Sequence, residues 1–75
     1  MISSEQVRAA RALVRWDQSK LAAEAGVSVE TIKRLEKMDG PLLAATGTTL
    51  SKIQTALEAA GVEFIDGTGV KLKQR

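Results

Sequence analysis

Residues 18–37 read QSKLAAEAGVSVETIKRLEK, and this stretch decides the fold. It divides into two short helical patterns on either side of Gly26. Helical spacing places one apolar face on the first pattern, formed by Leu21, Ala22 and Ala25. The second pattern has an apolar face of its own, formed by Ile32 and Leu35. We therefore expect two helices that turn their apolar faces towards each other.

The residues between the two patterns favour a tight corner. Gly26 tolerates the left-handed dihedral angles that a reversal within a few residues needs. Ser28 is a suitable N-cap, because its hydroxyl can accept from the free amides of the next turn. Ala22 is small where the two helices would cross. Two helices meeting steeply around such a turn form a helix-turn-helix, whose second helix can enter the DNA major groove.

This segment resembles the helix-turn-helix of the phage-repressor-like Xre/Cro/C1 family. The resemblance is carried by Gln18, Leu21, Ala22, Gly26, Val27, Ser28, Ile32, Leu35 and Glu36. It extends to residues 7–11 before the motif and 49–53 after it, so it covers the chain up to about Gly61. It implies a mainly α fold, a compact four- or five-helix repressor-like domain over residues 1–61, with the motif at 18–37.

The flanking sequence supplies the other helices. Ser3 and Gln6 stand at capping-box spacing and predict a helix over residues 4–14. Asp17 is expected to cap the second helix, over residues 18–24, and the third should run over residues 29–37. A fourth helix, capped by Thr48 or Thr49 and continuing to Ala60, would close the core. The resemblance further implies a fold-holding ion pair between Arg11 and Glu36.

The tail changes from helical to strand period. Residues 62–65 and 70–73 flank Asp66-Gly67-Thr68-Gly69, which predicts a small C-terminal β-hairpin as an appendage, residues 62–75, of the same domain. The preferred register pairs Val62 with Leu72, Glu63 with Lys71, and Phe64 with Val70. A two-stranded hairpin is marginal alone, so its apolar face must cover its own domain or pair with another copy. The candidate residues for a homodimer contact are Val62, Phe64, Val70 and Leu72.

Composition bounds the function. The 75 residues contain neither Cys nor His, so we expect no structural zinc, no metal site and no cofactor. No catalytic constellation or phosphate-binding loop is present, so we do not expect an enzyme. The net charge of +2 is compatible with nucleic acid but does not establish it. No apolar run could span a membrane, and we expect a cytoplasmic protein, associated with the nucleoid when it is bound to DNA.

The resemblance assigns roles to particular side chains in double-stranded DNA binding. Val29, Glu30 and Arg34 would read base edges: Arg34 can bind guanine, Glu30 can accept from cytosine, and Val29 can touch a thymine methyl. The candidates for contacts with phosphate or backbone are Gln18, Lys20, Ser28, Thr31, Lys33 and Lys37. The alternative without DNA contact is that the third helix simply presents a solvated charged face, on which Glu30 and Arg34 form an i,i+4 ion pair.

Two functions remain open from the sequence. The first is a small transcriptional regulator that binds DNA sequence-specifically, as a homodimer on half-sites about 34 Å apart. The second is a protein-interaction module, such as an antiactivator or an antitoxin-like partner, which keeps the fold without reading DNA. Glu30 keeps the second open, because a carboxylate facing a polyanion is unfavourable unless it meets a specific donor.

Overall fold

The structure, a computed structural model, describes residues 2–40, 42, 45–66 and 68–73. It is mainly helical. The described elements are α1 (Ser4–Val14), α2 (Gln18–Ala25), α3 (Val29–Lys37), α4 (Gly47–Ala59), β1 (Val62–Ile65) and β2 (Gly69–Leu72). The sequence predicted the bounds of α1 and α3, and the end of α2 differs by one residue. No helix in the described part of the chain combines the length and the apolar character needed to cross a bilayer.

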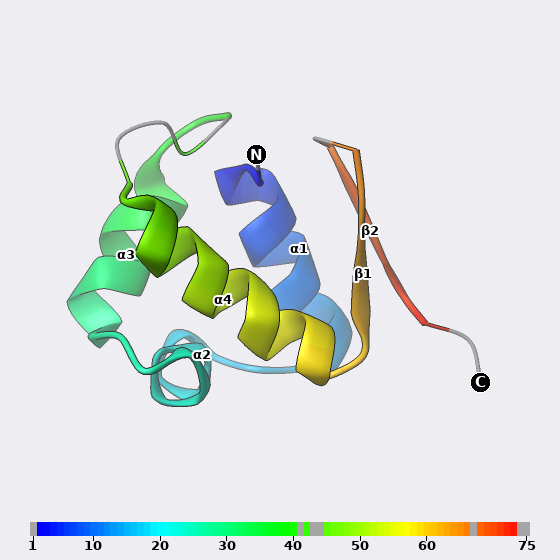
Figure 1. The fold of residues 1–75 in the computed structure, drawn as a ribbon, viewed down its shortest axis with the longest axis horizontal. Coiled ribbons are helices and arrows are strands. Elements are labelled where there is room, and N and C mark those ends of the chain that lie inside the picture. Colours follow the sequence, from blue (N-terminus) through cyan, green and yellow to red (C-terminus); the bar gives the residue numbers. More distant parts are fainter. Residues whose placement is uncertain (1, 41, 43–44, 67, 74–75) are drawn as a thin grey trace.

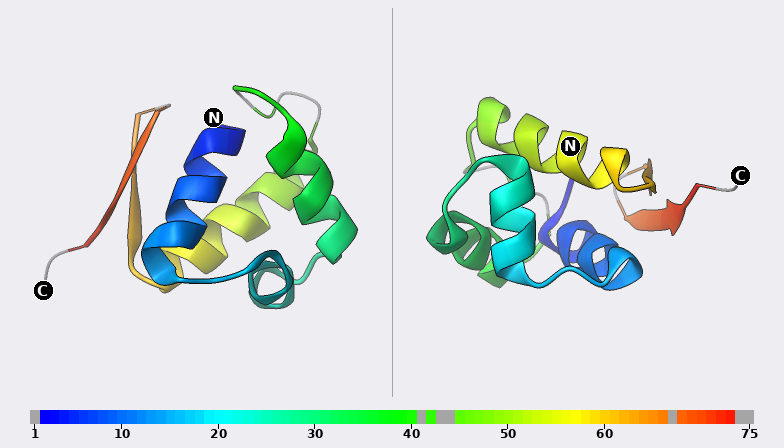
Figure 2. Two further views of the ribbon diagram at one scale, coloured as in Figure 1. Left: turned by 180° about the vertical axis from the view of Figure 1, so that it is seen from behind. Right: turned by 90° about the horizontal axis from the view of Figure 1, so that it is seen from below.

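The elements surround one core. Figure 1 shows α4 crossing in front of α1, with α2 below, α3 at one side and the hairpin at the other. The view from behind in Figure 2 again places α3 and the hairpin on opposite sides of α1. The buried apolar side chains are Ile2, Val7, Ala10, Leu21, Ala22, Ala25, Ile32, Leu35, Leu42, Leu50, Ile53, Ala56, Leu57 and Val62. Every described element except β2 contributes to this set.

Three of the four helix starts follow the prediction. The Ser3 hydroxyl accepts from the amide of Gln6 at 3.1 Å, and the Gln6 side-chain oxygen accepts from the amide of Ser3 at 2.8 Å, so the capping box is present. Asp17 accepts from the amide of Lys20 at 2.7 Å. Ser28 caps α3 in the predicted way. Because these caps lie directly before an apolar helical period, local sequence was enough to locate them.

The predicted cap of the fourth helix is wrong. Thr46, rather than Thr48 or Thr49, is the N-cap, and its hydroxyl accepts from the amide of Thr49 at 3.2 Å. The earlier start adds helical hydrogen bonds while leaving the buried stripe of α4 in place, since the Thr46 carbonyl already accepts from the amide of Leu50. At the other end, Ala60 is the C-cap rather than the last helical residue.

The hairpin has the predicted antiparallel register, with Val62 opposite Leu72, Glu63 opposite Lys71, and Phe64 opposite Val70. Its apolar face covers its own domain. Val62 has no exposed surface, and Phe64 and Val70 pack partly buried against the core. The hairpin is therefore part of the packed domain, and of the four predicted dimer residues only Leu72 is substantially exposed, at 47%.

A buried glutamine ties the hairpin to α1. Gln6 has no exposed surface, and its side-chain amide donates to the carbonyl of Asp66 at 3.3 Å and to that of Gly69 at 3.1 Å. The same side chain closes the capping box through its oxygen. One residue therefore satisfies backbone groups at the start of α1 and at the turn of the hairpin, where an unpaired polar group would be costly.

Candidate functional site

A tight turn joins α2 to α3. Gly26 adopts φ +72°, the left-handed conformation that the sequence predicted for this corner. The amide of Val27 donates to the carbonyl of Ala22 at 3.0 Å, which satisfies a carbonyl in the last turn of α2. Ser28 then accepts from the amide of Thr31 at 3.1 Å, and only three residues separate the end of α2 from the start of α3. This local hydrogen bonding fixes the direction in which α3 leaves the turn.

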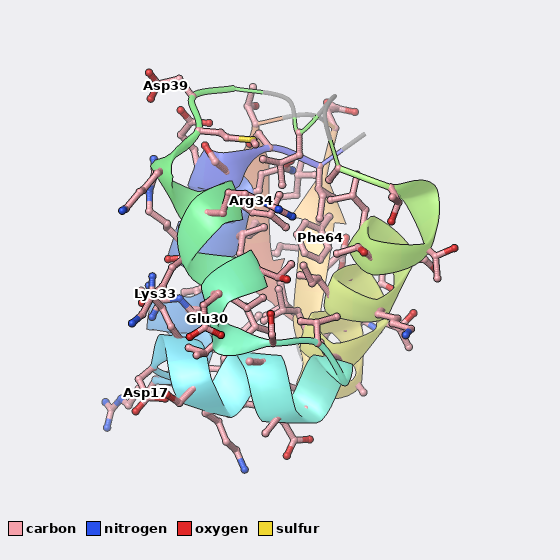
Figure 3. The ribbon with its side chains drawn as sticks, turned by 90° about the vertical axis from the view of Figure 1, so that its left-hand side faces the viewer. Asp17, Glu30, Lys33, Arg34, Asp39 and Phe64 are labelled. Carbon is pink, nitrogen blue, oxygen red and sulfur yellow. The ribbon has the colours of Figure 1, made fainter. Side chains whose placement is uncertain are left out.

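The third helix has one buried and one exposed face. Ile32, Leu35 and Glu36 are buried against the domain. The opposite face carries the exposed side chains of Glu30, Lys33, Arg34 and Lys37. Figure 3 shows α3 in front of the rest of the domain, with Glu30, Lys33 and Arg34 extending from it and Phe64 lying behind. The predicted base-reading residues are thus brought together, except that Val29 is partly buried against the core.

The predicted ion pair holds the inner side of α3. The guanidinium of Arg11 donates to both carboxylate oxygens of Glu36, at 2.6 Å from Nε and 2.7 Å from Nη2. Glu36 is buried, and its side chain also accepts from the Gln18 amide at 3.2 Å. The hydrogen bonds to Glu36 raise the pKa of Arg11, so this cation stays charged throughout the accessible pH range. The pair connects α1, the start of α2 and the end of α3.

The first turns of α1 also hold the chain at the end of α3, which the sequence did not indicate. A guanidinium nitrogen of Arg8 donates to the carbonyl of Glu36, and the Ser4 hydroxyl donates to the carbonyl of Met38. Both carbonyls lie near the C-terminal end of a helix, where backbone acceptors lack helical partners. A cation at this end also interacts favourably with the helix dipole. Arg8 and Ser4 therefore fix the C-terminal end of α3.

Glu5 completes this contact. Its carboxylate accepts from the amide of Gly40 at 3.0 and 3.2 Å, and the amide of Ser4 donates to the Gly40 carbonyl at 3.0 Å. The pKa of Glu5 is lowered, first by its own backbone N–H and next by that of Gly40, because both stabilise the ionised form. The α1 helix is thus joined to the segment after α3 by backbone and side-chain bonds.

The predicted phosphate-binding residues are placed in two ways. Lys33 and Lys37 are exposed on α3 and take part in no salt bridge among the described residues. Lys20, on α2, forms a salt bridge with Glu24, with 3.2 Å between Nζ and Oε2. The same Nζ lies over the ring of Trp16, 5.8 Å from the ring centroid. Gln18 donates to Glu36, which leaves the second hydrogen of its amide for another acceptor. The Ser28 and Thr31 hydroxyl groups lie 2.8 Å apart at the start of α3.

The remaining surface shows which apolar side chains are free. Apart from Leu72, the exposed large apolar residues among those described are Leu13, on α1, and Ile65, at the end of β1. The side chain of Leu13 is 38% exposed. No family model matches the chain, and no curated protein matches it. Its function must therefore be argued from its own residues.

Proposed function

We propose that the chain binds double-stranded DNA sequence-specifically through a helix-turn-helix formed by α2 and α3. The observation that carries the proposal is the exposed face of α3, which presents the cations Lys33, Arg34 and Lys37 and the carboxylate of Glu30. The buried face of the same helix is bonded to α1 through Arg11 and Glu36. A helix that follows a short turn and presents free cations along one face fits the DNA major groove. In that arrangement the chain acts as a small transcriptional regulator of the repressor-like class.

The side chains divide into contacts that position the protein and contacts that read sequence. Lys33 and Lys37 face the phosphates, and the start of α2 adds Lys20 and the free amide hydrogen of Gln18. Ser28 and Thr31 lie close to the backbone at the start of α3. The base-reading positions are Arg34, Glu30 and the exposed part of Val29.

The proposal is tested by titrating fluorescent duplexes with the full chain at several salt concentrations. We expect binding that weakens steeply with salt, because cations on the protein displace counterions from the phosphates. The double variant Lys33→Ala/Arg34→Ala should lose specific binding and lower the salt slope by about one for the phosphate contact of Lys33. The control, Lys52→Ala, removes a charge from an exposed position on α4 and should keep most of the affinity.

The alternative is a protein-interaction module, an antiactivator or antitoxin-like partner. One observation favours it: a shallow depression on α3 is lined by Glu30, Lys33, Arg34, Lys37 and Met38. Aliphatic stems and a thioether in a hollow suit a protein side chain as well as a base. Absence of duplex binding at low salt, together with retention by another protein in a pull-down, would favour this alternative.

We further propose that the DNA-binding form is a homodimer to which the hairpin contributes. Leu72 supports this, because it is a large apolar side chain that is 47% exposed at the end of β2. Contact through side chains is favoured over pairing of two β2 edges, because Lys71 on β2 and Lys73 directly after it oppose edge-to-edge association. Sedimentation of Leu72→Lys tests this: a wild-type dimer should become a monomer, whereas an unchanged dimer would place the interface elsewhere.

A further inference from the structure

Two opposite charges on α3 stay apart although their spacing permits a pair. Glu30 and Arg34 are at i and i+4, with the carboxylate on the N-terminal side, which is the more favourable order for a helical ion pair. No salt bridge joins them. By contrast, Lys20 and Glu24 have the same spacing in the less favourable order and lie 3.2 Å apart. Figure 3 shows Glu30 and Arg34 extending separately from α3.

The two free groups have complementary chemistry. An ionised carboxylate only accepts hydrogen bonds, whereas a guanidinium only donates them. In the major groove cytosine offers an amino donor, and guanine offers two adjacent acceptors that match a guanidinium fork. Adenine also has an amino group, but its neighbouring ring nitrogen is an acceptor that repels a carboxylate. Glu30 therefore suits cytosine and Arg34 suits guanine.

Helix geometry sets how far apart the two bases lie. Residues four apart are separated by about 6 Å along a helix axis, and stacked bases are separated by about 3.4 Å. We propose that each half-site contains two G·C pairs, at most about two positions apart, with cytosine bonded to Glu30 and guanine bonded to Arg34. This inference rests on the proposed DNA binding and adds to it the sequence that α3 selects.

A purely structural role for Glu30 makes a different prediction. Glu30 lies in the first turn of α3, where a carboxylate stabilises the positive end of the helix dipole. If that were its only role, Glu30→Gln would lower stability slightly and leave the selected DNA sequence unchanged. If Glu30 reads a base, replacing it should change the base preferred at one position of the bound sequence. Each such position is one column in an alignment of the selected sites.

The test is selection of bound sites from random duplexes with the full-length chain, followed by affinity measurements on single-base variants. In Glu30→Gln, we expect the column with cytosine to change to adenine, because a glutamine amide can bind adenine bidentately. In Arg34→Lys, we expect the guanine column to flatten, since lysine keeps the charge but loses the fork. Each change should alter discrimination at its own column by roughly 5- to 150-fold.

The control is Lys33→Gln, which removes a charge next to both residues. It should weaken binding to all duplexes and leave both columns unchanged. Circular dichroism of each variant confirms that it is folded, as expected for exposed side chains. The inference is overturned if wild-type selection gives no G·C pair at these columns, or if Glu30→Gln leaves its column unchanged. Salt-dependent duplex binding would survive either result and keep the proposed function, whereas no duplex binding at all would overturn both.

Discussion

Removing Arg11 should destabilise the domain far more than removing an exposed arginine does. In Arg11→Met the aliphatic stem is kept, but the carboxylate of Glu36 loses both guanidinium bonds. The side chain of Glu36 is only 4% exposed, so water replaces those bonds poorly, and among the described residues the Gln18 amide is the remaining donor. Leaving one partner of a buried pair uncompensated costs about 3 kcal/mol.

This magnitude is large for a domain of this size. A 75-residue domain has a total stability on the order of 4–11 kcal/mol. A loss of about 3 kcal/mol should lower Tm by roughly 12–24 °C. Glu36→Gln should cost less, because the amide oxygen still accepts from Arg11, whose side chain is 21% exposed and can reach water. Arg11→Met should therefore lose more stability than Glu36→Gln, because Glu36 is the more deeply buried partner.

The assay is urea unfolding followed by circular dichroism and by the fluorescence of Trp16. The tryptophan is a suitable reporter because it is partly buried and its carbonyl accepts from Arg11 at 2.9 Å. The matched control is Arg15→Met, since Arg15 is exposed at the end of the same helix and should change stability by less than about 0.5 kcal/mol. Equal losses in the two arginine variants, or a loss in Arg11→Met below about 1 kcal/mol, would refute the reasoning.

Three further changes test the corner, the hairpin anchor and the start of α1. Gly26→Ala should cost about 1 kcal/mol in urea unfolding, because φ is +72° there while an added Cβ meets nothing within 4 Å; a neutral result would mean that the corner relaxes. Gln6→Ala should cost about 2 kcal/mol, since it removes the capping box and leaves two hairpin carbonyls without their donor, whereas Gln54→Ala should cost under about 0.5 kcal/mol. Glu5→Gln tests pH dependence: with a pKa lowered from 4.5, wild-type Glu5 stabilises the fold above that value and loses this contribution as pH falls through the lowered pKa. Wild type should therefore lose more stability than the variant between pH 6 and pH 3, and parallel pH profiles would contradict this.

Local signals in the sequence were sufficient for most of the fold. Asp17 and Ser28 were found as caps because each is followed by an apolar helical period, and Gly26 marked the corner between two such periods. The register of the hairpin followed from placing Val62, Phe64, Val70 and Leu72 on one face and the opposite charges of Glu63 and Lys71 on the other. The start of α4 was missed because Thr46, Thr48 and Thr49 are chemically equal caps, and local sequence does not choose among them.

Contacts between distant segments were harder to predict. The exposed face of α3 was found because helical period alone places its charges together. The bonds from Arg8 and Ser4 to carbonyls near the end of α3 were not found. Their acceptors are backbone groups, which every residue possesses, so residue type at the acceptor carries no signal. Such contacts depend on how the loop after α3 returns to α1.

Gln6 was predicted in part: the sequence indicated its capping box but not its bonds to the hairpin. The hydrogen-bonding capacity of its side chain could have indicated that a second contact exists. It lies next to Val7 and four residues before Ala10, on the face that α1 buries. The capping box uses only the oxygen of its amide and leaves the NH₂ group without a partner. A buried donor without a partner is costly, so burial of that face requires acceptors from elsewhere in the chain. The acceptors are the carbonyl of Asp66, directly after β1, and that of Gly69, at the start of β2.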